Sequence, residues 1–320
     1  MRAMREPERR TWIILGAAVV AVVAVAMAAA CNRGGGAGDG PTVALVLKTL
    51  NNPFFIEMEA GAREAADSLG IELLVQAPER EIDVEKQMQI VENLLQTEID
   101  VLALVPSGSR EIVPAIAKAN QAGVPVVIVD TRVDADALAE AGAYTATFIG
   151  SDNVDGGRIA GQFVARALDG QGRVAVLEGI PGHETGDSRL RGFREAIAEH
   201  PGVSIVASQT ANWERDQAFN VTQNMLQSHP DLDAIFAAND VMALGAVEAI
   251  AGAGLTRDLI VVGFDAQQEA RAAIRDGGMD ATIAQHPREM GRLAVESSWS
   301  ILQGETPPPE QPVRIELVTG

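Results

Sequence analysis

The sequence is poor in cysteine, histidine and basic residues. It has a single cysteine, Cys31, and four histidines among 320 residues. One cysteine excludes an internal disulfide framework and a zinc site built from several thiolates. There are 25 Lys and Arg against 44 Asp and Glu, which gives a net charge of −19. A chain this acidic repels a phosphate backbone, so we expect no nucleic-acid partner.

Sequence motifs of hydrolysis and of phosphate binding are absent. The chain has no G-x-S-x-G and no G-x-x-x-x-G-K-[ST] sequence. The segment 179–188 holds His183, Asp187 and Ser188, residues that also occur in hydrolases, but no supporting motif accompanies them. We therefore expect a protein that is not an enzyme and that uses no cofactor and no metal ion.

One hydrophobic run is long enough to span a bilayer. Residues 11–30 are uncharged, follow a basic segment and directly precede Cys31. This order is typical of an export signal, and the three alanines before Cys31 favour a lipoprotein signal peptide at 1–30 with Cys31 acylated. A plain cleaved signal and a retained anchor helix are the alternatives. Each places the body outside the cytoplasm, in the periplasm or on the outer face of the membrane. The glycine-rich residues 31–41 predict a flexible tether.

The rest of the chain alternates short apolar segments with helical patterns. Eleven segments have the composition of strands: 42–48, 71–76, 99–105, 124–129, 145–150, 173–179, 203–209, 234–238, 259–264, 281–285 and 313–319. A helical stripe runs from Phe55 to Leu69, and Asp83 is a candidate N-cap for a second helix. Apolar strands between amphipathic helices predict parallel sheets that are covered on both faces. Eleven strands exceed one ordinary sheet, so we expect two doubly wound α/β lobes.

Polar residues follow several of these segments directly. In an open parallel sheet, ligands bind beyond the carboxyl ends of the strands. Each such residue alone is better explained as a helix cap or a turn. Together, carboxylates and amides suit the paired hydroxyl groups of a sugar, and aromatic rings nearby can pack against its apolar face or belong to the core. The residues at these positions are Asn51, Asn52, Asp130, Asn239, Asp240, Asp265, Gln285 and His286, with Phe54, Phe55 and Trp213 as the aromatic candidates.

From about residue 42 to residue 319 the chain resembles the periplasmic sugar-binding proteins of ABC importers, and the ribose-binding proteins in particular. The resemblance is carried by ALVLKTLNNPFF (44–55), IGSDNVDGGRIAG (149–161), SRLRGF (188–193), AIFAANDVMALGA (234–246), VVGFDA (261–266) and ATIAQHP (281–287). It implies a type I periplasmic-binding-protein-like fold with a three-crossover hinge. The N-terminal lobe would comprise 42–150 plus 286–314, and the C-terminal lobe 151–285 plus 315–320, with the sugar between them.

The resemblance also implies a set of ligand-binding residues: Asn52, Phe54, Phe55, Asp130, Arg132, Arg189, Trp213, Asn239, Asp265 and Gln285. Two positions depart from the ribose-binding pattern. Ribose binders carry Arg directly after the carboxylate of the fourth strand, whereas this chain has Thr131 and then Arg132, so either residue could take that place. Trp213 stands where ribose binders have Phe. These departures argue against ribose itself and leave pentoses and hexoses open.

The function that the resemblance implies is the capture of a monosaccharide and its delivery to the permease of an ABC sugar importer. We expect a monomer that is attached to the membrane through the lipidated Cys31. A sugar or polyol sensor that presents its ligand to a membrane chemoreceptor or kinase is the alternative. The same fold forms the core of LacI-type repressors, but these require a basic helix-turn-helix where this chain has an export signal.

Overall fold

The computed structural model describes residues 40–255 and 259–320. The expected signal peptide, the acylation site at Cys31 and all but the last two residues of the expected tether lie outside these residues. Within the described part, no helix is both long and apolar enough to cross a membrane.

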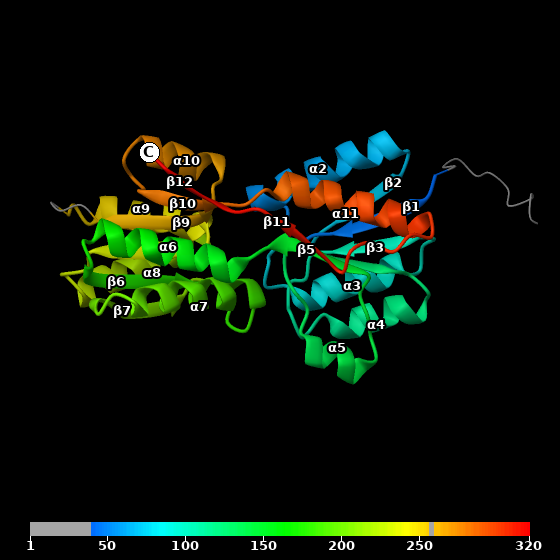
Figure 1. Cartoon of the computed structure of the whole chain (residues 1–320), viewed down its shortest axis with the longest axis horizontal. Coiled ribbons are helices and arrows are strands. Elements are labelled where there is room, and N and C mark those ends of the chain that lie inside the picture. Colours follow the sequence, from blue (N-terminus) through cyan, green and yellow to red (C-terminus); the bar gives the residue numbers. More distant parts are fainter. Residues whose placement is uncertain (1–39, 256–258) are drawn as a thin grey trace, which may run out of the picture. The chain divides into compact units, whose positions relative to one another are not determined.

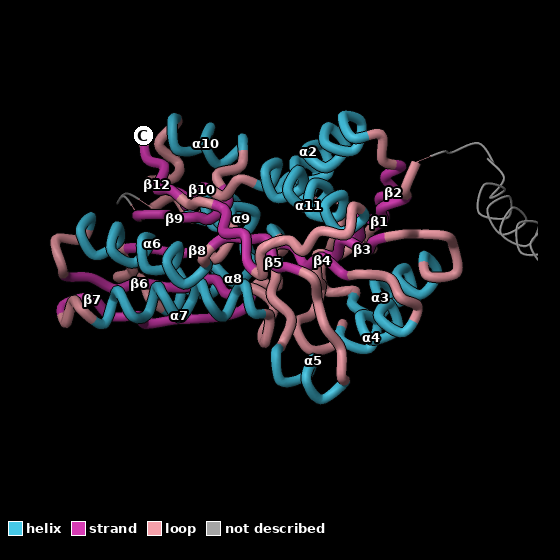
Figure 2. The backbone as a smooth tube through the Cα atoms, turned by 45° about the vertical axis from the view of Figure 1, so that its right-hand side comes forward, coloured by secondary structure: helices cyan, strands magenta, loops and turns pink. Residues whose placement is uncertain are grey.

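The first of two sheets has six parallel strands in the order β11-β5-β4-β3-β1-β2 (Figure 1). Its strands are β1 (Thr42–Val46), β2 (Glu72–Gln76), β3 (Val101–Leu104), β4 (Val126–Val129), β5 (Thr147–Ser151) and β11 (Glu310–Val313). The helices of this lobe are α2 (Pro53–Leu69), α3 (Val84–Leu94), α4 (Val113–Gln121), α5 (Ala135–Ala141) and α11 (Pro287–Leu302). Figure 2 shows α2 beside α11 and α3 beside α4.

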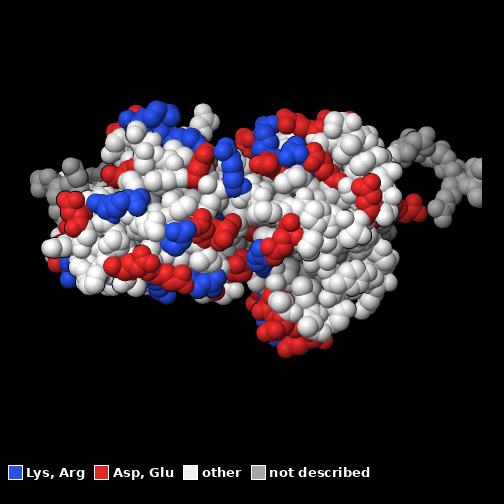
Figure 3. All heavy atoms as spheres, viewed as in Figure 1, with Lys and Arg blue, Asp and Glu red and all other residues white. Residues whose placement is uncertain are grey.

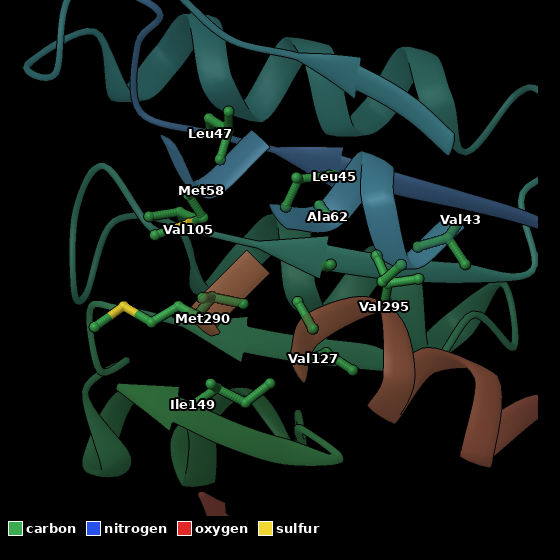
Figure 4. Packing of buried hydrophobic residues seen from close by; sticks show 14 of the residues in the cluster. Val43, Leu45, Leu47, Met58, Ala62, Val105, Val127, Ile149, Met290 and Val295 are labelled. Atoms are coloured by element: carbon green, nitrogen blue, oxygen red, sulfur yellow. The ribbon is translucent and has the colours of Figure 1, made fainter. Parts of the chain in front are cut away.

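Strand β1 shows why this sheet is covered on both faces. Alternate side chains of a strand point to opposite faces. Val43 and Leu45 pack with Met58 of α2 and Met290 of α11 in one buried cluster (Figure 4). Ala44, between them in the sequence, packs in a second cluster with residues of α3 and α4. The four consecutive apolar residues Val43–Val46 are therefore buried on both sides of the sheet, as the sequence predicts.

The second sheet also has six strands, in the order β12-β10-β9-β8-β6-β7. They are β6 (Gln171–Glu178), β7 (Gly202–Thr210), β8 (Ala234–Ala237), β9 (Ile260–Asp265), β10 (Ala281–Ala284) and β12 (Glu316–Thr319). All pairs are parallel except that of β10 with β12. The helices are α6 (Asn153–Ala167), α7 (Glu184–Ala198), α8 (Arg215–Ser228), α9 (Asp240–Gly252) and α10 (Gln268–Arg275). One buried cluster joins α6 and α7 to the sheet, and another joins α8, α9 and α10 to its other face. The two doubly wound α/β lobes are thus confirmed.

Helices α6 and α7 approach each other unusually closely through two glycines. A Cβ atom at Gly157 of α6 would lie 1.9 Å from the carbonyl oxygen of Arg189 on α7. A Cβ atom at Gly192 of α7 would lie 1.9 Å from the carbonyl oxygen of Val154 on α6. No side chain fits at either place, so these glycines set the position of α7 and of Arg189, which belongs to the candidate site.

The structure corrects two local predictions. The expected strand 313–319 is two strands, because the chain leaves the first sheet after Val313 and joins the second at Glu316. The chain also passes between the sheets after β5 and after β10. Asp83 precedes α3, but its side chain does not cap that helix; Arg80 holds its carboxylate instead, at 3.1 Å.

Candidate functional site

A small cavity lies where loops of the two lobes meet. Eight of the ten residues predicted to bind ligand line it: Asn52, Phe54, Phe55, Asp130, Arg189, Trp213, Asn239 and Asp265. Lys48, Glu81 and Thr185 complete the lining. Most of these residues follow the carboxyl ends of parallel strands, which all open toward one edge of their sheet. The strand-end positions in the sequence therefore converge in space.

Asp130 and Lys48 form a buried ion pair in this cavity. Lys48 Nζ lies 3.0 Å from Asp130 Oδ2, and both residues are nearly inaccessible to solvent. Thr131 donates a second hydrogen bond to the same oxygen, also at 3.0 Å. Burial opposes the ionisation of Asp130, but the charges of Lys48 and Arg189, with these hydrogen bonds, hold its pKa below its usual value. Asp130 is therefore an anion with its Oδ1 free to accept.

The backbone of the site is strained at three positions. Asp130 has a φ of 64°, Trp213 of 67° and Asp265 of 114°. Residues with a Cβ atom rarely adopt such angles, and each costs roughly 1–3 kcal/mol unless the surroundings impose it. Strain of this kind gathers at functional sites, which supports the assignment of this cavity.

Asn52 connects a helix end to both lobes. Its Oδ1 accepts from the backbone N–H of Phe54 at 3.0 Å, which caps α2, and from Nε2 of Gln267 at 2.9 Å. Its Nδ2 donates to Glu81 at 3.0 Å. Burial raises the pKa of Glu81, although Lys48 and Asn52 act in the opposite direction. The loop that carries Glu81 therefore takes part in the site.

Arg189 and Asp265 form the opposing charged pair on the second lobe. The Arg189 guanidinium donates to Asn153 Oδ1 at 2.9 Å and to the carbonyl of Ala238 at 2.7 Å, and it lies 3.6 Å from Asp265. It also stacks on the ring of Phe264, with Cζ 3.8 Å from the centroid. The guanidinium is thus held rigidly. Burial raises the pKa of Asp265 to about 7, against the charge of Arg189 and a hydrogen bond from Gln285.

Trp213 fills one side of the cavity and depends on two glycines. A Cβ atom at Gly179 would lie 2.0 Å from the indole ring, and one at Gly186 would lie 3.1 Å from it. The indole N–H has no hydrogen-bond partner among the described residues. On the first lobe, Phe54 and Phe55 meet edge to face, with centroids 5.2 Å apart. The cavity therefore offers aromatic surface from both lobes.

Two predicted ligand-binding residues lie outside the cavity lining. Arg132 turns to the surface, where it pairs with Glu310 at 2.7 Å and covers the ring of Phe148. The neighbouring Thr131 points inward instead, because Asp130 takes the left-handed conformation just before it. Gln285 stands behind Asp265, to which it donates at 2.8 Å.

Two of the other residues at strand ends, Asp240 and Asn51, have structural partners. Asp240 is fully buried and accepts from Thr282 Oγ1 at 2.6 Å and from the backbone N–H of Gln267 at 2.8 Å. Asn51 is exposed and donates to the carbonyl of Glu79. His286 lines a wider groove outside the site. For these positions, the explanation by turns and local capping is the one that the contacts support.

Sequence reasoning missed three lining residues. Lys48 lies two residues after the end of β1, so a search of the residues just beyond each strand could also have located it. Thr185 lies in the first turn of α7 and not at a strand end, so the strand-end rule does not reach it. Glu81 lies in an irregular loop, and no sequence pattern marks it.

Contacts between the lobes close the cavity. Thr131 Oγ1 lies 2.9 Å from Thr185 Oγ1, and since the Thr131 proton goes to Asp130, Thr185 is the donor. Gln267 reaches Asn52 as described, and the backbone N–H of Glu184 donates to Ser109 Oγ at 3.1 Å. The structure therefore shows the closed form.

A wider groove of about 800 Å³ runs between α2, α10 and α11. It shares Phe54 and the buried Asp265 with the small cavity. Its other charges are mostly exposed and form surface pairs, as when Arg288 pairs with Glu57 and Glu64. Figure 3 shows acidic and basic side chains intermingled over the visible surface in the same way. Exposed ion pairs of this kind contribute little to stability and give little selectivity for a ligand. The buried polar set of the small cavity is the better candidate for a specific site.

Comparison with known proteins shows the family of the chain. Residues 43–306 match the family model described as "Periplasmic binding protein domain". The chain is 38% identical over 297 residues to the ribose import binding protein of Escherichia coli, covering 93% of this chain and 96% of that protein. It is 40% identical over 264 residues to the ribose import binding protein of Bacillus subtilis, covering 82% of each.

A solved structure is similar over the same region. It is an ABC transporter periplasmic solute binding protein from Actinobacillus succinogenes with bound D-allose, 40% identical, with a TM-score of 0.83. The alignment covers 87% of this chain and 97% of that one. Its two-lobed fold and the family match lead to the same conclusion: the chain belongs to the periplasmic binding protein family.

Proposed function

We propose that the chain is an extracytoplasmic receptor that captures a monosaccharide, a pentose or a hexose, and delivers it to an ABC-type sugar importer. The observation that carries the proposal is the buried polar set around the small cavity, flanked by aromatic rings from both lobes. The two relatives from Escherichia coli and Bacillus subtilis are named import binding proteins, and this favours an importer over a sensor. The protein acts by binding and performs no reaction.

The charges of the site favour a neutral polyhydroxy ligand. Lys48 is neutralised by Asp130, and Arg189 lies beside Asp265, so neither cation is available as a free anion site. Oxygens of Asp130 and Asp265 can accept from hydroxyl groups, while Arg189 and Asn239 can donate to ring or hydroxyl oxygens. Trp213, Phe54 and Phe55 can pack against the C–H faces of a sugar ring.

Closure of the lobes follows from this division of contacts. Asn52, Lys48 and Asp130 belong to the first lobe, and Arg189 and Asp265 to the second. A sugar that contacts both sets binds the closed form better than the open form, and this difference in affinity drives closure. A dissociation constant near 1 μM requires only about −8 kcal/mol, which a few such hydrogen bonds can supply.

Isothermal titration calorimetry on the purified protein tests the proposal. D-Allose and D-ribose are the first sugars to use, and D-gluconate is the matched anionic control. We expect one of the neutral sugars to bind at micromolar concentration and the anion not to bind. Arg189→Ala should lower the affinity at least tenfold. Tight binding of the anion, or an affinity that Arg189→Ala leaves unchanged, would contradict the assignment.

We further propose that the lobes extend over 42–150 plus 286–314 and over 151–285 plus 315–320. The strand membership of the two sheets supports these limits to within one residue, since Ser151 still belongs to β5 of the first sheet. We also propose that the chain is a monomer. We propose that it is anchored to the membrane through acylated Cys31, because a basic segment, an apolar run and three alanines precede that cysteine. Mass spectrometry of the protein from membranes and light scattering test these proposals, with Cys31→Ser as the control.

A further inference from the structure

Three consecutive residues at the start of α7 reach across to the first lobe. His183 Nε2 lies 3.4 Å from the carbonyl oxygen of Pro106, the N–H of Glu184 donates to Ser109 Oγ, and Thr185 donates to Thr131. His183, Thr185 and Thr131 are almost completely buried. We call residues 183–185 the α7 latch.

His183 occupies the centre of this latch, in surroundings that suit only a neutral ring. It is 2% exposed and packs edge-on against Trp213, with ring centroids 6.1 Å apart. Nε2 can donate a long hydrogen bond to Pro106, whereas Nδ1 has no partner among the described residues. A charged imidazole would have two N–H donors and a single acceptor.

The charged groups around His183 reinforce this preference. Burial lowers the pKa of His183 to about 3, and the cations Lys48, at the end of β1, and Arg189, on α7, act in the same direction. Asp130, after β4, and the carbonyl of Pro106 act in the opposite direction but do not compensate. All of these groups belong to the closed cavity.

We propose that the α7 latch sets the ligand affinity by stabilising the closed form, and that His183 must lose its proton for the latch to close. The inference rests on the proposed function and adds a regulatory property to it. In the open form the latch separates from Pro106, Ser109 and Thr131, so His183 is hydrated and titrates near its ordinary value. Closure then releases a proton from every molecule in which His183 was charged, and acid favours the open form.

The size of the pH effect on closure follows from the titration of His183 in the open form and in the closed form. With an ordinary histidine pKa of about 6.5 in the open form, closure becomes about 30-fold less favourable at pH 5 than at pH 8. Ligand affinity should fall by the same factor, because the ligand is held by the closed form. A receptor of this kind releases its sugar on acidification.

Calorimetric titration of D-allose and D-ribose at pH 8 and pH 5 tests the proposal. We expect the affinity of the unaltered protein to fall about 30-fold between these pH values, and His183→Gln to remove that part of the fall. Thr185→Val should lower the affinity at both pH values equally, because it removes a latch contact without a titrating group. His200→Gln, at the other end of α7, is the matched control and should leave the pH dependence intact.

A measurement without sugar separates this proposal from the proposed function. Fluorescent labels at Asp136→Cys on α5 and Glu195→Cys on α7, in a Cys31→Ser background, report the distance between the lobes. We expect acid to lengthen this distance in the unaltered latch and not in His183→Gln. If neither sugar binds at pH 8, the choice of ligand fails while the distance still tests the latch. The same pH dependence with His183 and with Gln at this position, in affinity or in distance, overturns the proposal.

Discussion

The ammonium group of Lys48 lies 3.0 Å from the carboxylate of Asp130, and the two residues come from different strand ends of one sheet. In the ribose-binding pattern, the residue after this carboxylate is Arg, and here it is Thr131. Lys48 brings a positive charge to the carboxylate from β1 instead. The site thus keeps a buried cation beside Asp130 while Arg132 stays at the surface.

Removing one partner of this pair should cost more than removing both. Lys48→Met leaves the Asp130 carboxylate buried without its cation, and we expect the free energy of unfolding to fall by about 3–5 kcal/mol. The double variant Lys48→Met with Asp130→Asn should recover much of this loss. Urea unfolding of the two single variants and the double variant measures the coupling. Strictly additive losses would show that the pair does not act as a unit.

The ionised carboxylate of Asp265 should lower the free energy of unfolding at neutral and alkaline pH. Its pKa is raised to about 7 in the folded protein, whereas an unfolded carboxyl group titrates near 3.9. Between these values the folded state holds the extra proton, so the free energy of unfolding falls as the pH rises, and the loss is complete above pH 7. Asp265→Asn removes this loss and should gain about 1–3 kcal/mol at pH 8 relative to pH 4.

Thermal unfolding at the two pH values checks this expectation, and calorimetry checks the accompanying loss of sugar affinity. The neighbouring carboxyl group of Asp240 also has a raised pKa, from burial and from Asp265. Its ionisation should therefore become easier in the variant. A melting temperature that Asp265→Asn changes equally at pH 4 and pH 8 would contradict the assigned titration.

Two glycine substitutions should change the free energy of unfolding in opposite directions, because Gly192 lies in the contact of α6 with α7 and Gly252 of α9 has free space around it. Gly192→Ala places a methyl group against the carbonyl of Val154, so we expect a loss of about 1–3 kcal/mol in unfolding free energy and weaker sugar binding as Arg189 moves. Gly252→Ala, in α9, meets nothing within 4 Å and should raise stability by up to about 1 kcal/mol. Denaturant unfolding compares them directly, and a neutral Gly192→Ala would disprove the packing argument.

The roles of neighbouring residues 131 and 132 can be separated by substitution. Arg132→Ala removes a surface ion pair and should change the sugar affinity less than about threefold. Thr131→Val keeps the shape but leaves Asp130 and Thr185 without a hydroxyl partner, and should weaken binding by about 5- to 30-fold. Calorimetry on both variants gives the comparison. If Arg132→Ala weakened sugar binding more than Thr131→Val did, Arg132 would belong to the ligand-binding site after all.

The fold was largely predictable from the sequence, because periodicity reports burial. Strands such as β1 hold consecutive apolar residues, and helices such as α2 carry one apolar stripe, which together determine a covered parallel sheet. The division of 313–319 between two sheets was not predictable. Pairing with β5 or with β10 depends on where those strands lie in space, and a local pattern does not contain that information.

The site was predictable where a strand end places a residue, and not where a loop does. Asp130, Asn239 and Asp265 follow or end strands, so their convergence follows from topology. Glu81 reaches the cavity from an irregular loop. The outward turn of Arg132 depends on the left-handed backbone at Asp130, which spacing alone does not reveal.

The amide oxygen of Asn52 accepts two hydrogen bonds, and this affects how easily the two lobes can separate. When the lobes part, Gln267 withdraws into water, where it finds new partners at little cost. The amide oxygen that it leaves behind still accepts from the first turn of α2, so no orphaned acceptor remains to resist separation. A receptor that releases its sugar in every transport cycle benefits from a contact between the lobes that breaks at little cost in free energy.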